Sequence, residues 1–300
     1  MSDDRVFSIG YRPLVERGPR RPPAWAIART MLMLAWRQRA TKIVLLVCLA
    51  VLGGHGIWLV STLLFERFSD FRSSGFSLGE MVGETREVLA NYLRMQFYTT
   101  AFAVAVIAGG AVAEDRAAGA FDLYFARPLT RADYALGKLG GAGLVPVATI
   151  LLPVMLLWLV AVGIAPDDLR PSLWWLGVPS LAGGVMGSAV LAFTIIGFSA
   201  LGQKGRTVSV AYIAGVVFLS SIVEGIIAGG HEWVGYLAPE RDLHTLVEWL
   251  FEPDRSLLGS QLGRYAATND SVLLSFGGLC AWIAAGFGLF WWRLRTEVVG

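Results

Sequence analysis

The chain has 300 residues, of which 55% are hydrophobic and 16% are charged, and its formal net charge is +2. Its mean hydropathy of +0.58 is too high for an ordinary soluble domain, whose interior could not bury so large an apolar fraction. The composition therefore excludes a soluble globular protein and predicts a membrane protein. Both cysteines, Cys48 and Cys280, fall within apolar runs, so no disulfide framework is expected.

Six apolar runs are long enough to cross a bilayer as helices, because about 20 such residues span a hydrocarbon core of about 30 Å. They are residues 43–65, 97–113, 139–164, 173–201, 207–229 and 271–292. The predicted fold class is therefore an all-α integral membrane protein with six transmembrane helices. Pro146, Pro153 and Pro179 predict kinks in the third and fourth of them.

Lysine and arginine are divided unevenly between the segments that join these runs. The segments that an inward-facing N-terminus would place in the cytoplasm hold 17 of them, and the opposite segments hold 8. Short cytoplasmic segments retain positive charge. We therefore expect a multi-pass protein of the cell (inner) membrane with both termini in the cytoplasm.

The region before the first run divides into two parts. Residues 1–23 are rich in arginine and proline and predict a flexible basic cytoplasmic arm, which would attract anionic lipid rather than nucleic acid. Residues 24–42 predict an amphipathic helix in the cytoplasmic interface, with an extension of the first span as the alternative. Its proposed apolar face consists of Trp25, Ala28, Met31, Leu32, Ala35 and Trp36.

Two further segments have helical periodicity outside the apolar runs. Residues 78–96 have one apolar face and are expected to continue into the second span. Between the fifth and sixth spans, the sequence bracketed by Pro239 and Pro253 predicts an outer amphipathic helix, too polar to cross the membrane. Its apolar stripe consists of Leu243, Leu246, Val247, Leu250 and Phe251.

Residues 114–138, which we call the elbow, interrupt the apolar sequence between the second and third spans. Glu114, Asp115 and Arg116 can continue the second span, and Gly119 permits a turn. Phe121, Tyr124 and Phe125 have the i, i+3, i+4 spacing of a short helix with one aromatic face.

The elbow then turns back toward the third span. Pro128 stops the aromatic helix, and Thr130 with Asp133 has the spacing of a capping box, so a new helix is expected to start at Arg131. Two protruding helices joined by a small aromatic helix would form a rigid connection. The alternative is an amphipathic connector that lies on the membrane surface.

The elbow resembles a hallmark of the permease subunits of type 2 ATP-binding cassette (ABC-2) exporters. It carries an acid at the end of the second span, a glycine about five positions on, an aromatic cluster, R-P-x-x-R and finally G-K. The resemblance implies that residues 43–300 form a six-span permease domain whose elbow is the coupling helix. The residues that it assigns to coupling are Glu114, Gly119, Phe121, Tyr124, Phe125, Arg127, Pro128, Arg131 and Lys138.

In that family the coupling helix docks on a separate ATP-binding subunit. The sequence has no G-x-x-x-x-G-K-[ST] phosphate-binding loop, so the chain itself is not expected to be an enzyme or to hold a cofactor. The resemblance implies two ATPase chains that bind ATP and Mg²⁺, a second permease chain that is identical or paralogous, surrounding membrane lipids, and a transported substrate of unidentified class.

Two other classes of function remain as alternatives, an ion-coupled secondary transporter and a polytopic membrane enzyme. Both would need polar or nucleophilic groups gathered at one depth, and the spans offer only Glu224 and His55. Glu224 could line a pathway or contact a second subunit, although its shallow position favours the outer interface. His55 is expected to make a helix-packing hydrogen bond.

His244 and Glu248 have the i, i+4 spacing of metal ligands, with His231 and Glu232 nearby. With three histidines in the chain, this pattern favours a solvated helix face over a metal site, and no metal is predicted.

Overall fold

The computed structural model describes residues 22–68, 78–125, 129–251 and 269–297. All regular elements in these ranges are helices, and none is a strand. In chain order they are α1 (Pro23–Trp36), α2 (Arg39–Phe68), α3 (Leu78–Ala108), α4 (Ala113–Ala117), α5 (Ala120–Phe125), α6 (Arg131–Pro146), the π-helix η2 (Val147–Leu151), α7 (Leu152–Ile164), α8 (Arg170–Trp174), α9 (Gly177–Leu201), α10 (Gly205–Ala228), the 3₁₀-helix η3 (Glu232–Leu237), α11 (Pro239–Phe251) and α13 (Val272–Glu297).

Six segments of the described chain are long and apolar enough to cross a membrane. They are Arg39–Leu64, Met81–Ala117, Arg131–Ile164, Arg170–Leu201, Gly205–Ala228 and Val272–Thr296. Each contains most of one predicted run, so the prediction of an all-helical protein with six span-length helices is confirmed. The expected continuity of residues 78–96 with the second span is also confirmed, because α3 contains residues 78–96 and the second run as far as Ala108.

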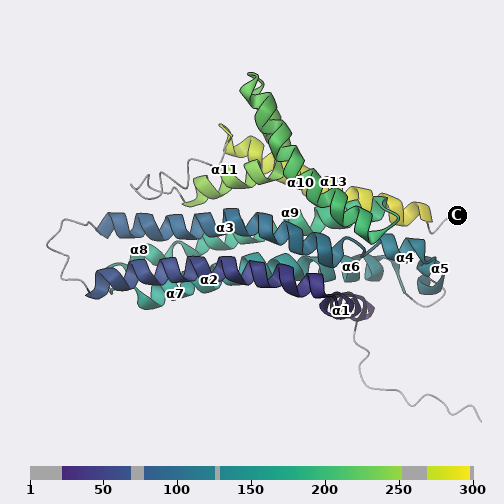
Figure 1. Ribbon diagram of the computed structural model, residues 1–300, viewed down its shortest axis with the longest axis horizontal. Helices are drawn as coiled ribbons and strands as arrows, with labels where there is room; N and C mark the ends of the chain where they lie inside the picture. Colours follow the sequence, from purple (N-terminus) through teal and green to yellow (C-terminus); the bar gives the residue numbers. More distant parts are fainter. Residues whose placement is uncertain (1–21, 69–77, 126–128, 252–268, 298–300) are drawn as a thin grey trace, which may run out of the picture.

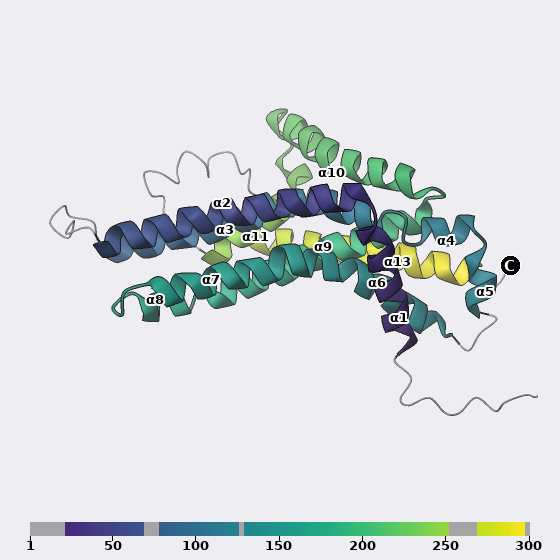
Figure 2. The ribbon, with the colours of Figure 1, turned by 60° about the horizontal axis from the view of Figure 1, so that its bottom comes forward.

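The long helices lie side by side in an elongated bundle, from which α10 leans away (Figures 1 and 2). One end of the bundle carries α1, α4, α5 and the C-terminal end of α13. The opposite end carries α8, the end of α2 and the start of α3. The N-terminal helix, the elbow and the C-terminal helix therefore meet at one end of the molecule.

The third span is not a continuous α-helix. The π-helix η2 separates α6 from α7 and lies between Pro146 and Pro153, where the sequence predicts a kink. Pro179 behaves differently, since it occupies the first turn of α9, where the missing N–H has no helical acceptor in any case.

The helix α1 ends earlier than predicted, at Trp36, and Arg39 already belongs to α2. The reason is its packing, because α1 crosses α6 and buries Ala28, Met31 and Ala35 (Figure 2). The approach is close: a methyl group on Gly137 of α6 would lie 2.8 Å from the Ala24 carbonyl oxygen. The chain must therefore turn after Trp36 before it can enter the bundle.

The helix α11 packs against α3, α9 and α13. Four residues of its predicted apolar stripe are buried and Leu250 is half-buried, but polar residues of the same helix, among them Asp242 and His244, are buried as well. The buried four are Leu243, Leu246, Val247 and Phe251.

Candidate functional site

The second span breaks before it reaches the elbow. The sequence allows its helix to continue through Arg116, but α3 ends at Ala108 and α4 begins only at Ala113. The interruption is possible because the neighbouring helix α9 supplies other partners for the backbone. The N–H groups of Val112 and Ala113 donate to the Ser199 hydroxyl at 2.9 and 3.2 Å, and so the turn leaves neither group unsatisfied.

The two turns of the elbow have the predicted chemistry. Gly119 adopts φ +61°, a left-handed conformation that favours glycine, and α5 follows directly. Before α6, the Thr130 hydroxyl accepts from the Asp133 N–H at 3.1 Å, and the Asp133 carboxylate accepts from the Thr130 N–H at 3.2 Å. This reciprocal capping box fixes the start of α6 at Arg131, as predicted.

An ion pair joins the two arms of the elbow. The Lys138 ammonium of α6 lies 2.7 Å from a carboxylate oxygen of Asp115 in α4, and the Tyr134 hydroxyl donates to the same oxygen at 2.8 Å. The Lys138 and Asp115 side chains are 8% and 17% exposed, so water screens this pair weakly. The ends of the second and third spans are thereby held together by charge.

Aromatic side chains surround this ion pair. The rings of Phe121 and Tyr124 lie 5.4 and 5.7 Å from the Tyr134 ring, and Phe290 of α13 contacts the same ring at 6.5 Å. Phe121 is buried inside the elbow, and Tyr124 is half-buried. Burial raises the pKa of the Tyr124 hydroxyl, and the negative charge of Asp115 raises it further.

Arg116 ties the elbow to the fourth span. Its guanidinium donates to the carbonyl oxygens of Ala200 and Gly202, at 2.9 and 2.8 Å, where α9 ends. A cation at the C-terminal end of a helix is stabilised by the unpaired carbonyl groups and by the helix dipole. This role was not predicted from the sequence, because the spacing of 84 residues between Arg116 and Ala200 carries no local signal.

The exposed residues in the described part of the elbow have mainly small side chains. Glu114, Ala117, Ala118, Gly119, Thr130, Ala132 and Leu136 are exposed, and Arg131 is half-buried. The backbone of Phe125 ends α5. Arg127 and Pro128, which the sequence analysis also assigned to coupling, lie outside the described residues.

A second group of polar residues joins α10, α11 and α13, and we call it the clasp: Glu224, Arg241, Asp242, Asn269 and Ser275. Arg241 pairs with Glu224 at 2.5 Å and donates to the Asn269 side-chain oxygen at 2.7 Å. The Asn269 amide donates to Asp242 at 2.8 Å and to Ser275 at 3.1 Å. Glu224, an isolated acid in the sequence, is thus paired within the chain, and its side chain is 51% exposed.

Burial shifts the pKa of the α11 side chains. Asp242 is fully buried, which raises the pKa of its carboxyl to about 7 although Ser275 and Asn269 hydrogen-bond to it. Burial, and then the charge of Arg94, lower the pKa of His244 to about 3. Both groups are therefore held toward their neutral forms.

The expectation of a solvated face around His244 is wrong. His244 is buried with its ring 5.8 Å from the Tyr98 ring, and Glu248 pairs with Arg94 of α3 at 4.0 Å. The described residues contain no group of three side chains that could hold a metal ion. His55 in α2 donates through Nδ1 to the Val51 carbonyl oxygen of its own helix at 2.9 Å.

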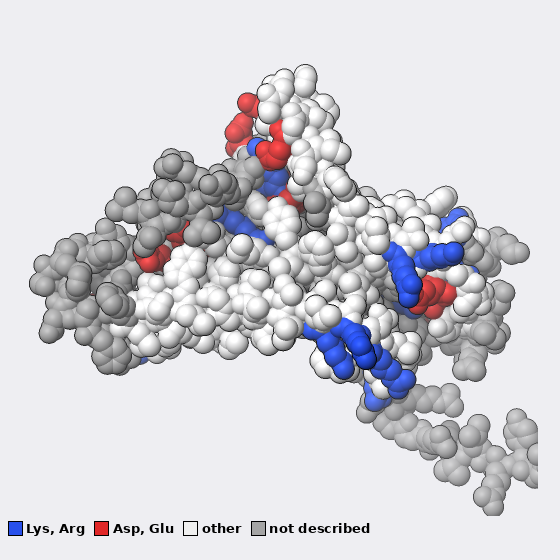
Figure 3. Space-filling model, in the orientation of Figure 1, with Lys and Arg blue, Asp and Glu red and all other residues white. Residues whose placement is uncertain are grey.

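On the face that Figure 3 shows, charged side chains gather in two regions. One region covers α1 and the elbow, and the other lies over α11, the outer part of α10 and the first part of α3. A broad uncharged surface lies between them, as expected of a protein whose middle section faces hydrocarbon.

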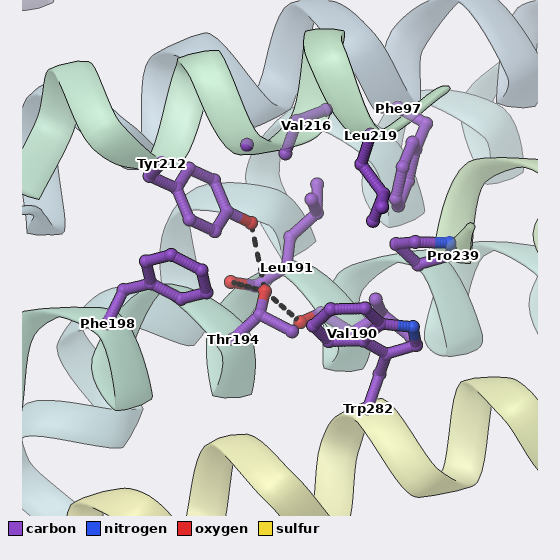
Figure 4. A pocket seen from close by; sticks show the side chains of 11 residues that line it. Phe97, Val190, Leu191, Thr194, Phe198, Tyr212, Val216, Leu219, Pro239 and Trp282 are labelled. Atoms are coloured by element: carbon purple, nitrogen blue, oxygen red, sulfur yellow. Dashed lines mark hydrogen bonds between the residues drawn. The ribbon is translucent and has the colours of Figure 1, made fainter. Parts of the chain in front are cut away.

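A cavity of about 170 Å³ lies where α10 leaves the bundle (Figure 4). Residues of α9, α10 and α13 form most of its wall, with Phe97 of α3 and Pro239 of α11 at one side. The Tyr212 and Thr194 hydroxyls lie 2.9 Å apart in its lining, and Thr194 donates to the Val190 carbonyl at 2.6 Å.

Comparison of the chain with protein-family models and with curated proteins finds no match.

Proposed function

We propose that this chain is the membrane-spanning permease subunit of an ATP-driven exporter of the ABC-2 type. The observation that carries the proposal is the Asp115–Lys138 ion pair with its Tyr134 hydrogen bond. It ties the ends of two span-length helices to one compact elbow. A force applied to such an elbow moves both spans together, whereas a flexible loop would absorb it.

The connections of the elbow extend this argument to other spans. Arg116 binds the end of α9, and Tyr134 contacts Phe290 of α13. A displacement of the elbow is therefore passed to the second, third, fourth and sixth spans at the same end of the bundle. The mechanism that we propose is alternating access or lateral extrusion, driven by closure of an ATPase dimer.

The working unit would contain two copies of a separate ATPase subunit, which bind ATP and Mg²⁺, and a second permease chain. In this arrangement the elbow is the coupling helix and faces the cytoplasm together with both termini, in the cell membrane. The helix α1 would lie in the cytoplasmic interface, where Trp25 and Trp36 are exposed and would reach lipid headgroups. The clasp and α11 would lie at the outer side.

The ion-coupled transporter receives less support from the structure. Within the apolar runs predicted from the sequence its acidic group would be Glu224, and this side chain is half exposed and paired with Arg241. A coupling acid is expected to be deeper and to exchange partners during transport.

The decisive experiment is recovery of an ATPase with the tagged permease from native membranes in mild detergent. The variant Ala118→Asp places a charge on the exposed surface of the elbow without disturbing the buried Phe121. Ser172→Asp, an exposed position in α8 at the other end of the bundle, is the matched control. We expect wild type and control to retain a protein with a phosphate-binding loop, and Ala118→Asp to lose at least about tenfold of it, a change equivalent to about 1.4 kcal/mol.

Equal recovery with both variants would count against docking at the elbow. Failure to recover any ATPase with the wild type would overturn the exporter proposal itself.

A further inference from the structure

We propose that the cavity between α9, α10 and α13 binds an acyl chain of a membrane lipid. This proposal depends on the cavity and on the membrane location of its helices, and it does not rest on the exporter function. It adds a ligand site that the elbow and the clasp do not involve.

The lining selects for hydrocarbon. With Thr194 donating to the Val190 carbonyl, the Tyr212 hydroxyl can donate to Thr194, and neither hydroxyl then has a proton left to donate to a polar ligand. Apart from the indole of Trp282, the rest of the lining is hydrocarbon, namely Phe97, Val190, Leu191, Phe198, Gly215, Val216, Leu219 and Pro239. A polar or charged occupant would lose its hydration without gaining partners.

The volume fits part of one chain. Apolar cavities of about 150 Å³ stay free of water and bind molecules of the size of benzene. A cavity of about 170 Å³ is therefore suited to a segment of roughly six carbon atoms. Filling it restores the dispersion contacts that the lining side chains lack when the cavity is empty.

The position of the cavity makes lipid the available occupant. Its main walls are span-length helices, and Figure 4 shows Tyr212 and Leu219 of α10 opposite Trp282 of α13. Next to the cavity, α10 leans away from the bundle and exposes Phe218 and Ile222 (Figure 1). A chain from the surrounding bilayer can enter between α10 and the bundle without passing a charged residue of the lining.

Gly215 provides a direct way to fill the cavity. It belongs to the lining, and a methyl group added to it would meet no heavy atom within 4 Å. The first carbon of a Gly215→Leu side chain therefore meets no clash, and we expect the side chain to occupy part of the space of the acyl chain. Gly225→Leu is the matched control, because Gly225 lies on the same helix, is equally open and does not line the cavity.

The experiment uses the full-length protein in vesicles of phosphatidylcholine and phosphatidylglycerol that contain phosphatidylcholine with a diazirine in one acyl chain. After illumination, mass spectrometry quantifies labelling at each residue. We expect labelling of Trp282 and Leu219 in the cavity, and also of Val210 and Leu273, which are exposed on the lipid-facing surface. Gly215→Leu should lower the cavity labelling at least fivefold and leave Leu273 unchanged, whereas Gly225→Leu should change neither.

Equal labelling of Trp282 in wild type and Gly215→Leu would overturn the proposal, as would labelling confined to the exposed residues. If Gly215→Leu does not fold, Leu219→Ala supplies the second test, because it enlarges the cavity. Labelling of Trp282 should then rise relative to Leu273, and an unchanged ratio would also refute the site.

Discussion

The Tyr92 hydroxyl of α3 donates a hydrogen bond of 2.8 Å to the backbone carbonyl of Thr149 in η2. That carbonyl lies four residues before Pro153, which has no N–H to complete the α-helical bond. Tyr92 therefore replaces the donor that proline removes. The Thr149 hydroxyl adds a second link to α3, since it lies 2.9 Å from the Thr100 hydroxyl. The π-helix in the third span is thus held by the second span.

We expect Tyr92→Phe to lower the free energy of unfolding by about 1 kcal/mol, the usual size of an interhelical hydrogen bond in membranes. Thermal unfolding in detergent measures the change. In a Pro153→Ala background, residue 153 regains an N–H, and the effect of Tyr92→Phe should shrink. An equal loss in both backgrounds would show that the proline is irrelevant to this bond.

The Asp115–Lys138 pair gives a second prediction. Lys138→Met leaves the Asp115 carboxylate weakly hydrated and without its cation, which should cost about 3–5 kcal/mol. Adding Asp115→Asn removes the unpaired charge, so the double variant should be more stable than Lys138→Met alone. Unfolding of wild type, both single variants and the double variant gives the coupling energy. Additive effects would contradict a functional ion pair at this site.

The buried carboxyl of Asp242 gives a pH dependence. Its pKa is about 7 in the fold and about 3.8 in the unfolded chain, so the folded state binds the proton more tightly. The stability that this group contributes is fully present below about pH 3.8 and is lost as the pH rises to about 7. Asp242→Asn, which keeps a neutral group at all pH values, should melt at least roughly 2–4 °C above wild type at pH 8.

At pH 4 wild type and Asp242→Asn should melt at similar temperatures, because Asp242 is then largely protonated in the folded state. His244 has the opposite dependence, because its pKa is lowered from 6.5 to about 3 and its contribution is lost as the pH falls through that range. His244 is present in both proteins, so the difference between them isolates Asp242. A difference in melting temperature that does not change between pH 4 and pH 8 would contradict the prediction.

Local chemistry made several features predictable from sequence. The spans follow from apolar length, the turn at Gly119 follows from its conformational freedom, and the start of α6 follows from the side chains of Thr130 and Asp133. Each of these depends on residues close together in the chain, where propensity and capping act directly.

The features that the sequence did not reveal depend on neighbours distant in the chain. His244 looked solvated because the face of α11 that carries Glu240 and Glu248 is polar, yet α3 presents Arg94 and Tyr98 to that face. A signal was present, since Arg94 and Tyr98 are four residues apart on one face of α3. A polar stripe within a membrane helix predicts a polar partner rather than solvent.

The contact between α9 and α13 gives the last prediction. It distinguishes two glycines of α13, Gly286 and Gly288, of which only Gly286 lies against the backbone of α9. A methyl group on Gly197 of α9 would lie 2.8 Å from the Gly286 Cα of α13, and one on Gly286 would overlap the Phe193 carbonyl of α9. Backbone atoms cannot move aside as side chains do, so Gly286→Ala must push the two helices apart. We expect a loss of about 1–3 kcal/mol or more, as for other overpacked cores.

Gly288, two residues further along α13, is the control, because a methyl group there meets no heavy atom within 4 Å. Gly288→Ala should be neutral or should stabilise the helix by up to about 1 kcal/mol, since alanine restricts the unfolded chain and favours the helix. Thermal unfolding of Gly286→Ala and Gly288→Ala in the same detergent shows whether the effect of alanine comes from close helix packing or from general helix propensity. If both alanine variants melted together, close approach of α9 and α13 at Gly286 would be excluded, and glycine at that position would need another explanation.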